Sequence, residues 1–322
     1  MRAMNVAPLA LCVVIPVLNE RDNVAPLVAR LDATLAGIGW EAIFVDDDST
    51  DGTRDAVRAV AAGDPRVRLL HRIGRRGLSS AFIEGAQASL APCIAAIDGD
   101  MQHDETLLPL MLAALTRDDA ELAIGSRYVA GGGVGDWDAT RAGLSTLATR
   151  ISQLLLKVPL SDPMSGFFMI RRDSFTETMR SLSGQGFKIL LDLFASAPRP
   201  LAFAEVPFTF RQRLHGESKL DAMVAWEYLM LLLEKLVGPA VPVRFLLFAL
   251  IGALGVGTHL FTLWFATHVL FVGFALAQSV ATIFAMTGKR FLPTKTIPDQ
   301  LSNCQSRSCE SVTFASRVCT PA

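Results

Sequence analysis

Short apolar runs alternate with segments of helical periodicity up to about residue 125, and this alternation narrows the possible folds more than any other property of the chain. It is typical of βαβ units, in which strands form a mostly parallel sheet and helices cover both faces. The strands are expected at residues 11–17, 42–45, 67–71, 93–97 and 121–125. The helices are expected at residues 23–35, 54–62 and 77–88. The N-terminal part is therefore predicted to be a Rossmann-like α/β domain.

Acidic residues follow two of the expected strands. The run Asp46-Asp47-Asp48 ends the second strand, and Asp98-Gly99-Asp100 ends the fourth. Ligands of open α/β sheets bind beyond the carboxyl ends of the strands, so we expect one site at this edge. With Gln102, the second group offers two carboxylates and an amide oxygen, a donor set that suits Mg²⁺ or Mn²⁺. A short Asp-Gly-Asp pattern is by itself a weak signal, since many such turns are simply solvated.

The chain carries no charged residue between Arg244 and Lys289. This run is about twice the roughly 20 residues that a membrane-spanning helix needs. We therefore expect two transmembrane helices, at about residues 245–265 and 269–287. Arg244 precedes the pair and Lys289 and Arg290 follow it, which by the positive-inside rule predicts that both ends lie in the cytoplasm.

Residues 222–237 are predicted to form an amphipathic helix in the membrane interface, because apolar side chains dominate and a few charges interrupt them. Residues 289–322 turn polar and lack periodicity, which predicts a disordered tail. The abrupt change after Gly288 suggests a frameshift or truncation. The expected organisation is residues 1–220 as an α/β domain, 221–242 as the interfacial helix, 243–288 as the membrane hairpin and 289–322 as the tail.

Composition excludes several classes of protein. The formal net charge of −1 lacks the excess of Lys and Arg that nucleic-acid binding requires. The hydrophobic fraction of 51% and the mean hydropathy of +0.38 fit an enzyme attached to a lipid bilayer. The five cysteines form no CxxC pair, so neither a zinc site nor a disulfide framework is indicated. The first residues contain no sustained apolar stretch, which predicts that the N-terminal domain stays in the cytoplasm.

Ordered segments of the chain resemble a known enzyme family. Residues 14–20 (VIPVLNE), 45–53 (VDDDSTDGT) and 98–103 (DGDMQH) resemble the nucleotide-binding half of family 2 inverting glycosyltransferases. Residues 125–128, 162–168, 186–190 and 213–220 narrow the resemblance to the dolichyl-phosphate, or polyprenyl-phosphate, mannose synthases. It covers about residues 10–225 and implies a GT-A-type fold. Residues 243–287 resemble the first half of GtrA-like membrane domains.

The resemblance also implies roles for individual residues. Those implied to bind the nucleotide are Pro16, Asn19, Glu20, Asp46, Asp47 and Asp98. Those implied to bind the metal are Asp98, Asp100 and Gln102. Those implied to face the acceptor phosphate are Arg127, Arg141, Ser145, Arg213 and Lys219, and the catalytic set is Asp100, Arg127, Arg213 and Lys219. Guanidinium groups bind phosphate oxygens in pairs, which fits the basic members.

The implied reaction is transfer of mannose from GDP-mannose to a polyprenyl phosphate, with inversion to a β-linked product. A lipid phosphate is already anionic at neutral pH, so no general base is required. Two alternatives stay open at this point. UDP-glucose could be the donor in the same reaction, or the chain could be a non-catalytic binding or flippase component of a membrane.

Overall fold

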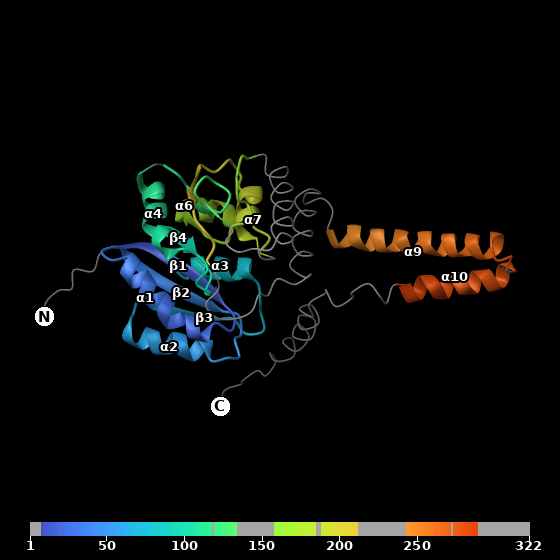
Figure 1. Cartoon of the computed structure of the whole chain (residues 1–322), viewed down its shortest axis with the longest axis horizontal. Helices are drawn as coiled ribbons and strands as arrows, with labels where there is room; N and C mark the ends of the chain where they lie inside the picture. The colour runs from blue at the N-terminus through green and yellow to red at the C-terminus, as the bar shows by residue number, and fades with distance from the viewer. Residues whose placement is uncertain are drawn as a thin grey trace, which may run out of the picture. The chain divides into compact units, whose positions relative to one another are not determined.

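The computed structural model describes residues 8–117, 119–133, 158–184, 188–211, 243–271 and 273–288. The chain divides into two compact units, Met1–Ala240 and Val241–Ala322 (Figure 1). The expected helix at 222–237 and the expected tail at 289–322 lie outside the described residues.

A seven-stranded sheet forms the centre of the first unit, with the strand order β3-β2-β1-β4-β6-β5-β7. All neighbouring pairs are parallel except those of β6, which runs antiparallel to both β4 and β5. The strands are β1 Leu9–Val17, β2 Gly39–Asp46, β3 Val67–His71, β4 Cys93–Ala96, β5 Leu122–Ser126, β6 Phe168–Arg171 and β7 Phe203–Pro207.

The predicted mostly parallel sheet is confirmed, and all five expected strands are present with shifts of at most three residues at their ends. The sequence interpretation missed β6 and β7. Strand β6 has four residues and β7 includes Glu205 and Pro207. Runs this short or this interrupted show no clear period of two, which is the signal that identifies a strand.

Alternate side chains of β1 point to opposite faces of the sheet and build two cores. Leu11, Val13 and Ile15 pack with α1, α2 and α4, whereas Cys12 and Val14 pack with α3, α6 and α7. Figure 1 shows these helices around the sheet of the first unit. The helices are η1 Arg21–Asn23, α1 Val24–Thr34, α2 Thr53–Gly63, α3 Leu78–Gln87, η2 Glu105–Leu107, α4 Leu108–Arg117, α6 Arg172–Met179 and α7 Ile189–Ser196.

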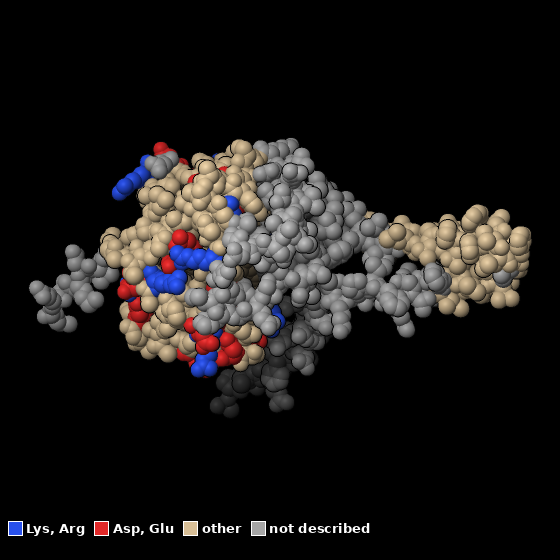
Figure 2. All heavy atoms as spheres, viewed as in Figure 1, with Lys and Arg blue, Asp and Glu red and all other residues tan. Residues whose placement is uncertain are grey.

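The second unit contains two packed helices, α9 Val243–His268 and α10 Phe274–Gly288, at the two places where the sequence predicts helices. Ala277 and Ala281 are fully buried. Large apolar side chains elsewhere on the pair are exposed, among them Phe248 at 75% and Phe274 at 69%. Figure 2 shows no charged side chain on the visible face of these helices. None of the helices within the described residues meets the length and apolarity needed to cross a membrane.

Helix α3 packs so closely on the sheet that only glycine fits at residue 85. A Cβ atom there would lie 2.5 Å from Val14 Cγ1 and 2.9 Å from Val45 Cγ2. We therefore expect Gly85→Val to lower the free energy of unfolding by about 1–3 kcal/mol through overpacking. Gly63→Val is the matched control, because a Cβ at Gly63 meets nothing within 4 Å. Denaturant unfolding followed by tryptophan fluorescence measures both, and equal stability of the two variants would contradict the close packing.

Candidate functional site

Three loops at the carboxyl edge of the sheet contain a residue with left-handed backbone. Asn19 follows β1 with φ of 56°, Asp48 follows β2 with φ of 64°, and Met101 follows β4 with φ of 63°. Such conformations cost about 1–3 kcal/mol each and cluster at ligand sites. Strands β2, β1 and β4 are adjacent and parallel, so their three loops meet at one edge. This edge is the candidate site.

The loops after β1 and β2 are joined by side-chain hydrogen bonds. The Asn19 backbone N–H donates to Ser49 Oγ at 2.9 Å, and the Thr50 N–H donates to Asn19 Oδ1 at 2.9 Å. The Glu20 N–H donates to Thr53 Oγ1 at 2.9 Å. Asn19 and Glu20, both predicted to bind the nucleotide, therefore hold the two loops in register, and Pro16 lies in β1 just before them.

Asp46 is completely buried where β2 ends. Its Oδ2 accepts the Ser49 N–H at 3.1 Å, and Arg54 Nε lies 3.8 Å from the same oxygen. Its Oδ1 has no hydrogen-bond partner within the described part of the chain. A buried acceptor without a partner is unfavourable, so this oxygen is a candidate acceptor for a ligand N–H.

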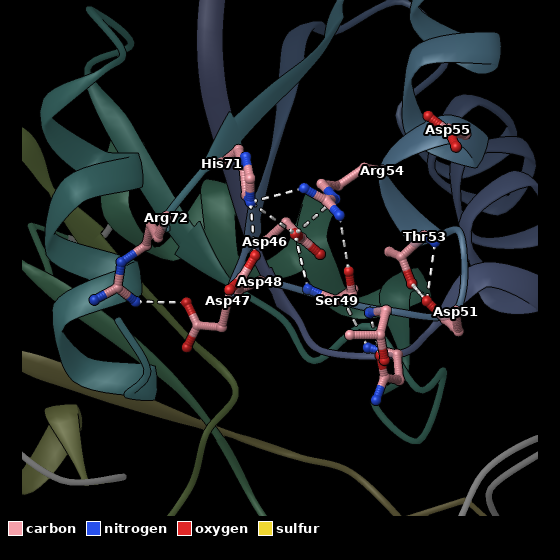
Figure 3. A network of polar contacts seen from close by, with 12 residues as sticks. Asp46, Asp47, Asp48, Ser49, Asp51, Thr53, Arg54, Asp55, His71 and Arg72 are labelled. Atoms are coloured by element: carbon pink, nitrogen blue, oxygen red, sulfur yellow. Dashed lines mark hydrogen bonds and ion pairs between the residues drawn. The ribbon is translucent and has the colours of Figure 1, made fainter. Parts of the chain in front are cut away.

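His71 contributes to the same acidic loop, as Figure 3 shows. Its Nε2 lies 3.1 Å from Asp48 Oδ1 and 3.0 Å from Arg54 Nη1. The hydrogen bond from His71 lowers the pKa of the Asp48 carboxyl below its ordinary value. The ionised form of Asp48 is therefore favoured by a histidine from β3 and, more weakly, by an arginine from α2.

Asp47 points away from this network toward Arg72 (Figure 3). Its Oδ1 accepts from Arg72 Nη1 at 2.6 Å and its Oδ2 accepts from the Gly77 N–H at 2.8 Å. Burial raises the pKa of the Asp47 carboxyl, while the Gly77 amide and Arg72 act in the opposite direction. Asp47 thus holds the loop at residues 72–77, a contact that the sequence interpretation did not foresee when it grouped Asp47 with Asp46.

The turn after β4 carries the residues predicted to bind a metal. Asp100 is buried, and its Oδ1 accepts the Gln102 N–H at 3.1 Å. The Asp98 N–H donates to His103 Nδ1 at 3.0 Å, and the His103 ring stacks on Phe167 at 5.2 Å. The His103 side chain therefore supports this turn through its hydrogen bond with the Asp98 backbone.

The same turn offers a donor set that fits a divalent cation. Asp98, Asp100 and Gln102 supply two carboxylates and one amide, the hard oxygen ligands that Mg²⁺ and Mn²⁺ prefer. Gln102 Nε2 donates to the Arg211 carbonyl at 3.1 Å, which directs the amide nitrogen to the protein and would leave Oε1 to face a cation. No group of three or more His, Cys, Asp or Glu able to hold a metal occurs in the described ranges.

Arg127 lies at the end of β5 in a buried ion pair with Asp162. Its Nε and Nη2 donate to the two carboxylate oxygens at 2.7 and 2.8 Å, and its backbone N–H donates to Oδ2 at 3.1 Å. Both side chains are buried. The arginine predicted to face a phosphate is therefore oriented by a carboxylate that the sequence interpretation had not assigned.

Lys188 is a further basic residue near this pair. Burial, together with the positive charge of Arg127, lowers the pKa of Lys188 to about 8, although Asp162 and Asp98 act in the opposite direction. These couplings link the lysine to both the ion pair and the metal turn. The conspicuous segment 186–190 was recognised in the sequence, but no role was given to its lysine. The predicted residues Arg141, Ser145, Arg213 and Lys219 lie outside the described residues.

Comparisons with known proteins identify the family of this chain. The model of the family described as "Glycosyl transferase family 2" matches residues 12–178, just over half of the chain. A dolichol-phosphate mannosyltransferase from Pyrococcus furiosus is 33% identical over 276 residues, covering 85% of this chain and 76% of that protein. One from Saccharomyces cerevisiae is 37% identical over 231 residues, covering 69% and 85%.

A solved structure shares the fold. Glucosyl-3-phosphoglycerate synthase from Mycobacterium tuberculosis, in complex with Mn²⁺, UDP-glucose and glycerol 3-phosphate, matches with a TM-score of 0.54 at 20% identity. The match covers 71% of this chain and 80% of that one. At this identity the likeness concerns the fold alone, and it supports the GT-A-type architecture predicted from the sequence.

The Arg127–Asp162 pair allows stability to be separated from function. Asp162→Leu leaves a buried guanidinium without its partner, so we expect a loss of about 3–5 kcal/mol in the free energy of unfolding. The double variant Arg127→Met/Asp162→Leu should recover much of this stability, because neither charge is then buried alone. Denaturant unfolding of the wild type, both single variants and the double variant measures the coupling. Simple additivity of the two single effects would contradict a direct buried pair.

Proposed function

Because this chain belongs to glycosyl transferase family 2, we propose that it transfers mannose from GDP-mannose to a polyprenyl phosphate. The observation that carries the proposal is that the loops after β1, β2 and β4 meet at one edge of the sheet, and that the loops after β2 and β4 carry acidic residues. Relatives named dolichol-phosphate mannosyltransferases, at 33% and 37% identity, support the donor sugar and the lipid acceptor.

The nucleotide is proposed to lie over the loops after β1 and β2. The unpartnered Asp46 Oδ1 would accept an N–H of the base, and Asn19 and Glu20 keep the neighbouring loop in place. Asp47 would contribute through the loop at 72–77 that it fixes rather than by direct contact. Nucleotide affinity would then depend on Asp46 more strongly than on Asp47.

Asp98, Asp100 and Gln102 would hold Mg²⁺ or Mn²⁺ at the turn after β4. When bound, the ion would supply positive charge that offsets the charge of the departing nucleoside diphosphate. The protein would hold the three ligand side chains in fixed positions. Gly99 has no room for a side chain, since a Cβ would lie 2.7 Å from Val17 Cγ1, and His103 supports the turn through the Asp98 N–H.

The acceptor phosphate is proposed to meet one hydroxyl and several basic side chains, namely Ser145 together with Arg127, Arg141, Arg213 and Lys219, and with the addition of Lys188. Arg127 is held in one orientation by Asp162, so little ordering is needed when an anion binds. The phosphate oxygen is already a nucleophile and would attack the anomeric carbon opposite the leaving diphosphate. Inversion to a β-linked product follows, with positioning and electrostatics as the main sources of catalysis.

The second unit is proposed to attach the enzyme to the bilayer. Helices α9 and α10 expose large apolar side chains such as Phe248 and Phe274, which lipid would cover. The finer proposal is a transmembrane hairpin with Arg244, Lys289 and Arg290 at its cytoplasmic ends, corresponding to the first half of a GtrA-like domain. An interfacial helix at residues 222–237 would precede it, and the catalytic domain would face the cytoplasm.

The proposed reaction is tested by incubating the full chain with labelled GDP-mannose, a polyprenyl phosphate and Mg²⁺ or Mn²⁺, then extracting the lipid. We expect labelled lipid with a β-linkage by NMR, none after chelation of the metal, and a loss of at least about 100-fold in kcat for Asp100→Ala. A parallel assay with UDP-glucose distinguishes the two donors. Absence of transfer by the wild-type chain would favour the binding or flippase alternative, full activity of Asp100→Ala would rule out its role as a metal ligand, and an α-linked product would contradict direct attack.

Lys188 gives the reaction a specific dependence on pH. Its ammonium is charged below its pKa of about 8 and neutral above it. If the charge binds a phosphate, KM should rise between pH 7 and 9 in the wild-type enzyme, whereas Lys188→Arg stays charged and should show a flatter profile. Lys188→Met should give a raised KM throughout. Steady-state kinetics with Mg²⁺ measures this, and identical profiles for the wild type and Lys188→Arg would exclude the lysine as the titrating group.

A further inference from the structure

We propose that Arg211 is a positioning residue for the metal-binding turn at 98–102. The inference rests on the proposed function, because that function assigns the metal to this turn. Arg211 follows β7 and is not itself one of the proposed metal ligands. Its contacts join parts of the chain that are more than 100 residues apart.

Two hydrogen bonds pair the backbone of Arg211 with Gln102. The Arg211 N–H donates to the Gln102 carbonyl at 3.0 Å, and Gln102 Nε2 donates to the Arg211 carbonyl at 3.1 Å. The second bond fixes the orientation of the amide whose oxygen would bind the cation. Partners of this kind, one step behind the ligands, orient them and strengthen metal binding.

The guanidinium of Arg211 binds the two acidic residues that follow the turn. Nη2 donates to Asp104 Oδ1 at 2.7 Å and Nη1 donates to Glu105 Oε2 at 2.9 Å. Glu105 is buried, and its other oxygen lies 3.6 Å from Arg30 Nη1. A buried carboxylate needs such partners, so the side chain of Arg211 stabilises the end of the turn as its backbone stabilises the ligand.

The chain just before Arg211 is also fixed. The Phe210 N–H donates to the Gly133 carbonyl at 3.0 Å, and the Gly133 N–H donates to the Phe208 carbonyl at 3.0 Å. The ring centroids of Phe208 and Phe210 each lie 5.9 Å from that of His103, in edge-to-face contacts. The segment therefore reaches Arg211 along a path packed against the metal turn. A disturbance at Arg211 should therefore lower the affinity of the turn for the cation.

Arg199 offers a matched control at the other end of β7. It also binds two carboxylates, Glu121 at 2.6 Å and Glu177 at 3.1 Å, and its side chain is similarly exposed, 48% against 36% for Arg211. Its partners lie outside the proposed metal and phosphate groups. Arg199→Met therefore removes an equivalent pair of ionic contacts without touching the turn.

The experiment measures Mn²⁺ binding to the full chain by electron paramagnetic resonance. We expect Arg211→Met to weaken Mn²⁺ binding about tenfold. Arg211→Lys, which keeps one charged donor, should restore part of the affinity. Arg199→Met should leave the affinity close to the wild-type value.

Two results would overturn the role of Arg211. Wild-type Mn²⁺ affinity in Arg211→Met would remove it directly, and an equal loss in Arg199→Met would reduce it to general stabilisation. Neither result bears on the proposed reaction, which fails if the wild-type enzyme transfers no mannose.

Discussion

The parallel pairing of β1 with β2 on one side and β4 on the other is the constraint on which the site depends. Val17 is paired with Asp46, and Val14 with Ala96, so the loops that follow these strands emerge at the same edge. The acidic groups at 46–48 and 98–100 are brought together by backbone hydrogen bonds and by the two cores beneath them. Side chains then refine a geometry that the sheet has already imposed.

Charges at this edge are paired before any ligand arrives. Arg72 with Asp47, Arg127 with Asp162 and Arg211 with Glu105 each match a buried or half-buried cation with a carboxylate. Such pairs contribute little net stability, since desolvation offsets their attraction, but each fixes a side chain in one orientation. Because these side chains are already ordered, little binding energy is lost in ordering them when a ligand binds, as expected where catalysis depends on positioning.

The sequence predicted those parts of the candidate site that depend on patterns within short segments of the chain. Apolar runs ending in carboxylates identified the strands and the turn at Asp98-Gly99-Asp100, because period and position suffice for both. The antiparallel strand β6, the Arg127–Asp162 pair and the link from Arg211 to Glu105 could not be predicted, because each joins residues distant in the chain. Asp47 shows the same limit: its neighbour Asp46 bonds within the loop after β2, while a partner 25 residues away turns Asp47 toward another loop.

We propose that the acidic loops after β2 and β4 together form one site for a nucleoside diphosphate and a divalent cation. Calorimetric titration of GDP into the full chain, with and without Mn²⁺, tests it most directly. Binding that requires Mn²⁺ and is lost in both Asp46→Ala and Asp100→Ala is the predicted result. GDP binding that is unchanged by chelation of the metal, or by either substitution, would contradict the account.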